Sequence, residues 1–200
     1  MSLTDTEIWD LADRMDIPLV FCGFKDELKK KKLQYNKSYI INMENEFDED
    51  GQRNTGSHYT CFQVNKYPNG KKEGIYFDSF GMPPPQIVED FTGMKLPFCN
   101  KDIQSLMNSA CGWYCLALLH FINSSNHRSG DLYTDAGDFT DLFEDLNVSK
   151  DHLKNEFILK HFFRAKDPEK RVPVELKGIS VKPQPDPNSI INEDDDLRKK

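Results

Sequence analysis

The feature that most constrains the fold is an apolar run over residues 111–122, which only Gly112 and His120 interrupt. A run of this length is too short to cross a bilayer, so it predicts a helix buried in a protein core. The preceding residues 108–110 are small and cap-forming, which favours a helix that begins at or beside Cys111. We expect the chain to be organised around this helix.

Cys111 is the first candidate for a chemical role. A cysteine at a helix start lies against the positive end of the helix dipole, which favours the thiolate over the thiol. Seven residues upstream, Gln104 carries a neutral amide that can donate hydrogen bonds. A thiolate with a nearby amide donor is the start of an acyl-transfer site, and such a site also needs a base.

Two segments rich in β-forming residues, 59–65 and 75–80, predict a hairpin. The residues between them include Pro68-Asn69-Gly70, which is a strong turn signal. His58 begins the first strand and Asp78 lies in the second. Antiparallel neighbours can bring two such side chains onto one face, with the carboxylate near the imidazole.

These residues together satisfy the needs of a cysteine nucleophile. The nucleophile requires a base, and the base requires a third group that holds its tautomer and orientation. Cys111, His58 and Asp78 fit these three roles. The Gln104 amide and the backbone N–H of Cys111 could donate hydrogen bonds to the oxyanion of a tetrahedral intermediate.

Each of the four residues also has an ordinary structural interpretation. A lone cysteine in an apolar run is usually a small core residue, and a lone histidine at a strand end usually lies at the surface. Asp78 alone could cap a turn, and Gln104 alone could be a solvated loop residue. Only their joint arrangement predicts chemistry.

Composition limits the class of protein. Two hundred residues favour one domain, with no apolar leader and no membrane-spanning segment. Five cysteines, an odd number without a paired framework, fit a reducing compartment. The net charge of -7 argues against a nucleic-acid binder. No cofactor and no metal site are expected, because no CxxC pair or His/Cys cluster has zinc-ligand spacing.

The main domain is predicted at residues 1–166, with further elements on both sides of the hairpin. Thr4 and Glu7 form a capping box before a first helix, and residues 39–43 predict a buried strand before a surface loop over 44–56. Two later helices are predicted from apolar faces, the second capped by Ser149. These faces comprise Phe139, Leu142, Phe143 and Leu146, and then Leu153, Phe157, Ile158 and Phe162.

Residues 167–200 are predicted to be a C-terminal extension. Apolar residues alternate over 172–181, which is typical of a strand. Residues 183–200 are rich in proline and charge, and we predict that they are disordered.

Four motifs carry a family resemblance. They are Gly56-Ser57-His58-Tyr59, Tyr76-Phe77-Asp78-Ser79-Phe80-Gly81, Gln104, and Asn108-Ser109-Ala110-Cys111-Gly112-Trp113-Tyr114-Cys115. In type, order and spacing they resemble the adenovirus-type cysteine proteases, which are viral relatives of the SUMO-protease clan. The likeness is greatest to the maturation proteases of virophages, polinton-like viruses and giant DNA viruses. The motifs span 56–115, and the order of flanking elements agrees over roughly 1–165.

The resemblance implies a papain-like α+β fold of the adenain type. In that fold a central buried helix packs against a small mixed, mainly antiparallel β-sheet, with helices around it. Residue by residue, the resemblance implies that Cys111 is the nucleophile and His58 the base. It makes Asp78 the orienting acid and Gln104 the oxyanion donor.

Two residues depart from the adenoviral pattern. Tyr59 stands where the family usually has Trp directly after the histidine, and it keeps an aromatic wall. Asp78 stands where the adenoviral branch has Glu, as in the SUMO-protease branch, and either acid can orient an imidazole. The resemblance further implies that Tyr59, Gly112 and Trp113 bind substrate.

The implied function is a cysteine endopeptidase that cleaves viral capsid precursor proteins during virion maturation, near glycine-containing sites. It would act in the virion and the host-cell cytoplasm. Adenoviral enzymes are also stimulated by DNA and by a peptide that adds a strand. The acidic balance gives no support for DNA beyond the basic run 29–32. Residues 172–181 suggest that the chain carries an equivalent activating strand of its own.

Two alternatives remain. The same fold and residues could cleave isopeptide bonds to ubiquitin-like modifiers or transfer acyl groups. The chain could also be a non-enzymatic binding module whose cysteines hold zinc, although Cys111 and Cys115 lack the spacing of zinc ligands.

Overall fold

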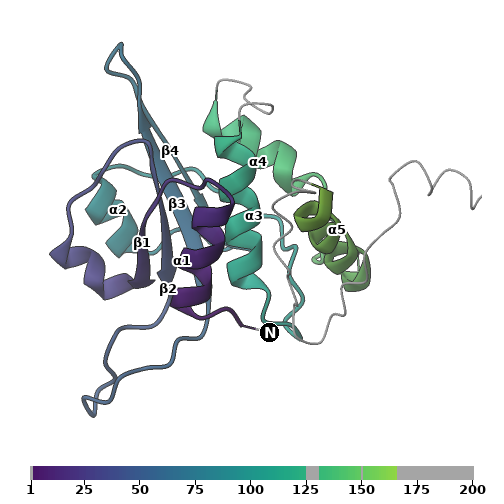
Figure 1. Cartoon of the computed structure of the whole chain (residues 1–200), viewed down its shortest axis with the longest axis horizontal. Coiled ribbons are helices and arrows are strands. Elements are labelled where there is room, and N and C mark those ends of the chain that lie inside the picture. Colours follow the sequence, from purple (N-terminus) through teal and green to yellow (C-terminus); the bar gives the residue numbers. More distant parts are fainter. Residues whose placement is uncertain (1, 125–130, 150, 166–200) are drawn as a thin grey trace, which may run out of the picture.

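The computed structural model describes residues 2–124, 131–149 and 151–165 (Figure 1). These residues form an α+β fold with a small mixed sheet and several helices, which confirms the coarse fold prediction. The papain-like, adenain-type arrangement remains a prediction. In chain order the elements are α1 (Asp5–Arg14), β1 (Leu19–Phe24), the 3-10 helix η1 (Lys25–Lys30), β2 (Lys37–Asn42), β3 (Tyr59–Lys66), β4 (Lys72–Phe77), α2 (Gln86–Thr92), α3 (Cys111–Asn123), α4 (Leu132–Thr140) and α5 (His152–Ala165).

The sheet has the strand order β1-β2-β3-β4. β1 and β2 are parallel and are joined through η1, whereas the other neighbouring pairs are antiparallel. The predicted hairpin is β3 and β4, and its turn closes with a hydrogen bond from the Gly70 N–H to the Tyr67 carbonyl at 2.9 Å. Gly70 has φ +83°, a left-handed conformation that glycine adopts without strain. The sequence prediction of a mixed, mainly antiparallel sheet is therefore confirmed, although β1 was not predicted.

Helices cover both faces of the sheet (Figure 1). α1, α3, α4 and α5 form one layer, and η1 and α2 lie against the opposite face. Alternate residues along each strand point to the two layers, so both sides of the central strands are apolar. Ile40, Cys61, Ile75 and Phe77 face the larger layer, and Tyr39, Ile41, Phe62, Val64 and Tyr76 face the smaller one.

α3 is the buried helix that the apolar run predicts. It begins at Cys111, and all its residues except His120 and Asn123 are buried. Its N-cap is Ala110, which makes no side-chain cap. The Asn108 side chain accepts instead from the Ala110 N–H at 3.3 Å, one residue before the helix. The start of the helix was predicted correctly, and its cap takes a different form.

The two later helices differ from their predicted faces. α4 includes Phe139 but ends at Thr140, where the chain turns with a bond from the Phe143 N–H to the Thr140 carbonyl at 3.1 Å. The prediction that Leu142, Phe143 and Leu146 share a helix face with Phe139 is therefore wrong. α5 exposes Leu153 and Phe157, which were predicted to lie on its apolar face. The buried face of this helix includes a polar residue, Asn155, together with Leu159 and Phe162. Because an amide lies where the helical pattern would have an apolar side chain, the apolar residues alone do not reveal which face is buried.

The main domain was predicted to end at 166, and the structure describes the chain through 165. The predicted added strand over 172–181 and the predicted disordered tail over 183–200 lie outside the described residues. Among the described helices, none combines the length and the apolar character needed to cross a bilayer.

Candidate active site

His58 and Asp78 lie at the same end of the β3–β4 hairpin. His58 directly precedes β3 and Asp78 directly follows β4. The register pairs Cys61 with Phe77, so the start of β3 lies beside the end of β4. The His58 Nε2 atom is 2.9 Å from the Asp78 Oδ1 atom. A carboxylate accepts hydrogen bonds only, so Nε2 carries a proton and Nδ1 is left for the sulfur.

Asp78 lies one residue beyond the strand in which it was predicted. Its Oδ1 atom accepts from the Phe80 N–H at 2.8 Å, and its carbonyl accepts from the Gly81 N–H at 2.9 Å. These bonds form a turn that ends the strand. Gly81 has φ +70°, and a Cβ atom there would be 2.6 Å from the Asn100 carbonyl oxygen, so the turn requires glycine.

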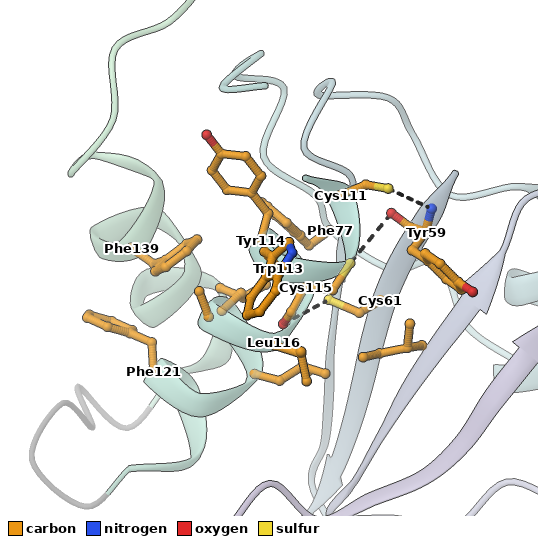
Figure 2. Packing of buried hydrophobic residues seen from close by; sticks show 14 of the residues in the cluster. Tyr59, Cys61, Phe77, Cys111, Trp113, Tyr114, Cys115, Leu116, Phe121 and Phe139 are labelled. Carbon is orange, nitrogen blue, oxygen red and sulfur yellow. Dashed lines mark hydrogen bonds between the residues drawn. The ribbon is translucent and has the colours of Figure 1, made fainter. Parts of the chain in front are cut away.

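Cys111 is the first residue of α3 and is buried. Its Sγ atom accepts from the Tyr59 N–H at 3.4 Å, across the junction between α3 and β3 (Figure 2). The first turn of a helix leaves N–H groups without intrahelical partners, and these groups favour negative charge nearby. The sulfur therefore lies between a strand N–H and the positive end of the helix.

His58 interacts with both partners at once. Burial of the ring acts to lower its pKa, but hydrogen bonds and charge from Asp78 and Cys111 outweigh burial and raise the pKa of His58 to about 9. The Phe80 ring lies 4.7 Å from the His58 ring between centroids and covers one side of it. The arrangement therefore favours the protonated, imidazolium form of His58 near neutral pH.

Gln104 has a defined amide orientation. Its side chain is buried, its Nε2 atom donates to the Asn108 carbonyl at 2.9 Å, and its Oε1 atom accepts from the Ser79 hydroxyl at 2.7 Å. A carbonyl can only accept, so the nitrogen must face Asn108 and the oxygen must face Ser79. An amide nitrogen has two N–H groups, and the bond to Asn108 uses one of them.

The three residues predicted to bind substrate lie against the core. Tyr59 is buried, and its hydroxyl donates to the Asp5 Oδ1 atom at 2.5 Å. A Cβ atom on Gly112 would be 3.3 Å from the Leu3 side chain, so this residue packs against the segment that enters α1. Trp113 is buried, with its ring edge-on to Phe163 at 5.1 Å. Contact of substrate with Gly112 or Trp113 would therefore involve their backbone atoms.

Cys115 shows how a core cysteine lies in the same helix. Its Sγ atom contacts the Tyr59 carbonyl at 3.5 Å, and the Cys61 Sγ atom contacts the Cys115 carbonyl at 3.9 Å (Figure 2). Burial, followed by the neighbouring Cys61 thiol, raises the pKa of Cys115 well above its usual range. Cys115 therefore stays a neutral thiol within the core.

Sequence reasoning missed residues that hold the candidate site. Ser79 follows Asp78 within a quoted motif, and its hydroxyl could have been recognised as a polar group beside the acid. Asp5 lies 54 residues from Tyr59, and Glu156 lies 48 residues from Asn108. No local pattern links residues so far apart, so only the fold reveals these pairs.

All five cysteines are free thiols. Within residues 2–124, 131–149 and 151–165, no group of three or more His, Cys, Asp or Glu residues could hold a metal ion. No protein-family model matches this chain, and a search of curated proteins likewise finds no match.

Proposed function

We propose that this protein is a cysteine endopeptidase in which Cys111 attacks the carbonyl carbon of a peptide bond. The observation that carries the proposal is the position of the His58 ring, which is bonded to the Asp78 carboxylate at 2.9 Å and is near enough to Cys111 for that residue to help raise the pKa of His58. A cysteine at a helix start, a base and an orienting acid are what thiol acyl transfer requires.

The first chemical step forms a tetrahedral intermediate. The Cys111 thiolate adds to the carbonyl carbon, and the carbonyl oxygen becomes an oxyanion. The Gln104 amide and the Cys111 backbone N–H are the proposed donors to that oxyanion. The buried amide of Gln104 supports this role, because a donor held in a water-poor site stabilises developing charge more than one in solvent does.

The second step breaks the peptide bond. The His58 imidazolium gives its proton to the leaving amine, the C–N bond breaks, and a thioester to Cys111 remains. His58 then takes a proton from water, and the resulting hydroxide displaces the thiolate and releases the acid product. Asp78 keeps the ring in one orientation throughout.

The substrate class rests on the resemblance of the motifs around His58, Asp78, Gln104 and Cys111. We propose viral capsid precursor proteins as substrates and cleavage near glycine-containing sites as the activity during virion maturation. A mixture of capsid-precursor peptides and ubiquitin-like substrates tests this class. Preferential cleavage of the ubiquitin-like substrates would instead favour the isopeptidase function.

The nucleophile is tested by Cys111→Ala, with Cys115→Ala as the matched control. Both substitutions remove one thiol from buried positions one turn apart on α3. We expect Cys111→Ala to abolish peptide cleavage while the thermal transition of the protein stays cooperative. Cys115→Ala should keep cleavage at a temperature where it is folded. Cleavage by Cys111→Ala at the wild-type rate would refute the proposal.

A thiol label distinguishes an enzyme from a binding module. Alkylation of Cys111 by iodoacetamide should slow when His58 is replaced by Ala, because the ring favours the reactive thiolate. Equal labelling rates in the two proteins would mean that Cys111 is not activated by His58.

A further inference from the structure

The segment that carries Gln104 is held mainly by hydrogen bonds. We call residues 104–110 the oxyanion segment. In its middle, Leu106 and Met107 are 85% and 91% exposed, so apolar packing does not fix this part of the chain. The conformation of the segment near Gln104 must therefore depend on the polar contacts that its other residues make.

Asn108 makes three of these contacts. Its backbone carbonyl accepts from the Gln104 Nε2 atom at 2.9 Å, and its Oδ1 atom accepts from the Ala110 N–H at 3.3 Å. Its Nδ2 atom donates to the Glu156 Oε1 atom at 2.7 Å, which links the segment to α5. Asn108 thus connects the amide of Gln104, the start of α3 and a carboxylate from far along the chain.

The orientation of the Asn108 side chain follows from its partners. The Ala110 N–H can only donate and the Glu156 carboxylate can only accept, so the oxygen faces Ala110 and the nitrogen faces Glu156. The bond to the carboxylate is assisted by its charge, and such bonds are about twice as strong as neutral ones. Glu156 is therefore the partner best able to hold Asn108 in place.

We propose that Glu156 is a positioning residue for the oxyanion donor. It holds Asn108, and the Asn108 carbonyl in turn holds one N–H of Gln104, which aims the other at the oxyanion. The inference rests on the proposed function of Gln104. A small displacement of such a donor slows the reaction even when substrate binding is unchanged.

A neighbouring residue on α5 has a different role. Asn155 is buried, and its amide bonds to the Ile103 and Glu144 carbonyls at 3.0 and 2.7 Å and to the Glu144 N–H at 2.7 Å. Those bonds satisfy backbone groups and hold the fold. Glu156 is only half-buried and contacts a side chain of the oxyanion segment. Its loss should affect the reaction more than the stability.

Two small probes separate these effects without knowledge of the natural substrate. With p-nitrophenyl acetate, the Cys111 thiolate attacks the ester carbonyl, the C–O bond breaks, nitrophenolate leaves and an acetyl thioester forms, through an oxyanion. With iodoacetamide, the thiolate displaces iodide from a CH₂ group, and no oxyanion forms. A defect in donor position should slow acetylation and leave alkylation unchanged.

The variants are Glu156→Ala, Glu156→Gln and a control, Lys154→Ala. The Gln side chain still accepts from Asn108 and should keep acetylation within about twofold of the wild-type rate. Glu156→Ala should lower the acetylation rate about tenfold, less than the ~10²–10³-fold expected for loss of a donor. Lys154→Ala removes an ion pair to Glu144 on the exposed side of α5 and should change neither rate.

A swap of donor and acceptor tests the contact itself. Asn108→Asp places two carboxylates together and should slow acetylation. Adding Glu156→Gln to that variant provides an N–H for the new carboxylate and should restore the rate. In the Gln104→Ala background, Glu156→Ala should cause no further loss, because the two residues act through one donor.

Clear results would overturn the inference. Wild-type acetylation by Glu156→Ala, no rescue of Asn108→Asp by Glu156→Gln, or an equal loss of acetylation and alkylation would each refute it. If Glu156→Ala does not fold, the Asn108 swap decides alone. Failure of the proposed function gives a different result, since Cys111→Ala would then release nitrophenolate as fast as the wild type.

Discussion

The two sides of the candidate site are built differently. On the sheet side, His58 and Asp78 adjoin buried strands, and the register of β3 and β4 sets their separation. On the segment side, Gln104 belongs to a stretch with an exposed middle, held by side chains from elsewhere. The sheet side is thus fixed by backbone pairing and the segment side by a few polar contacts.

The difference shows how one fold can combine a rigid pair, His58 and Asp78, with an amide, Gln104, whose surroundings are held by few contacts. Ladder hydrogen bonds and core packing on both faces resist movement of His58 relative to Asp78. Loss of one contact on the segment side can move Gln104 without unfolding the core. Substitutions on the two sides should therefore differ in the size and the kind of their effects.

The largest effect is expected on the sheet side. Asp78→Ala should lower kcat/KM by about 10³-fold, because His58 loses the group that fixes its tautomer and orientation. Asp78→Asn should lose less activity than Asp78→Ala. In the wild type the His58 Nε2 atom and the Phe80 N–H both donate to the Oδ1 atom of Asp78, and a single amide oxygen can accept from both. Steady-state cleavage of a fluorogenic peptide measures both variants. Equal losses would show that the negative charge, rather than orientation, is the main contribution.

A smaller effect is expected on the segment side. Gln104→Ala should reduce kcat by roughly 10²-fold with KM little changed, which is the usual result of removing one oxyanion donor. Its alkylation by iodoacetamide should keep the wild-type rate, because no oxyanion forms in that reaction. A fall in both rates would mean that the substitution disturbs Cys111 itself and would weaken the distinction between the two sides.

The smallest expected effect is a change in folding stability with pH, and it arises from His58 on the sheet side. The pKa of His58 is raised to about 9 in the folded protein, above the usual value near 6.5 in an unfolded chain. The folded state therefore binds more protons, so the stability from this group is complete below about pH 6.5 and is lost as pH rises through about 9. Denaturant midpoints should show the advantage of wild type over Asp78→Ala shrinking across this window.

The pH dependence of activity follows from the same group. The rate should fall on the alkaline side as His58 loses its proton near pH 9, and Asp78→Asn should move that limb to lower pH. Gln104→Ala should lower the rate without moving the limb, because its amide does not titrate. A shift in the Gln104 variant would show that the two sides are electrostatically coupled.

The sequence by itself determined the parts that depend on local order. Three predicted features are present in the structure: the capping box of Thr4 and Glu7, the hairpin turn that includes Gly70, and the buried helix from Cys111. Each follows from contacts between near neighbours or from one apolar run, so each could be predicted without knowledge of the tertiary structure. His58 and Asp78 could be chosen from the sequence in the same way, because they adjoin the two strands of the predicted hairpin.

Only the tertiary structure decided how distant residues meet. Asn155 lies buried among apolar residues, so the face of α5 could not be predicted from periodicity. The contacts of Asp5 with Tyr59 and of Glu156 with Asn108 join residues about 50 positions apart. Hydrogen bonds of this kind arise where packed elements leave polar groups to be satisfied, and that depends on the arrangement of the whole chain.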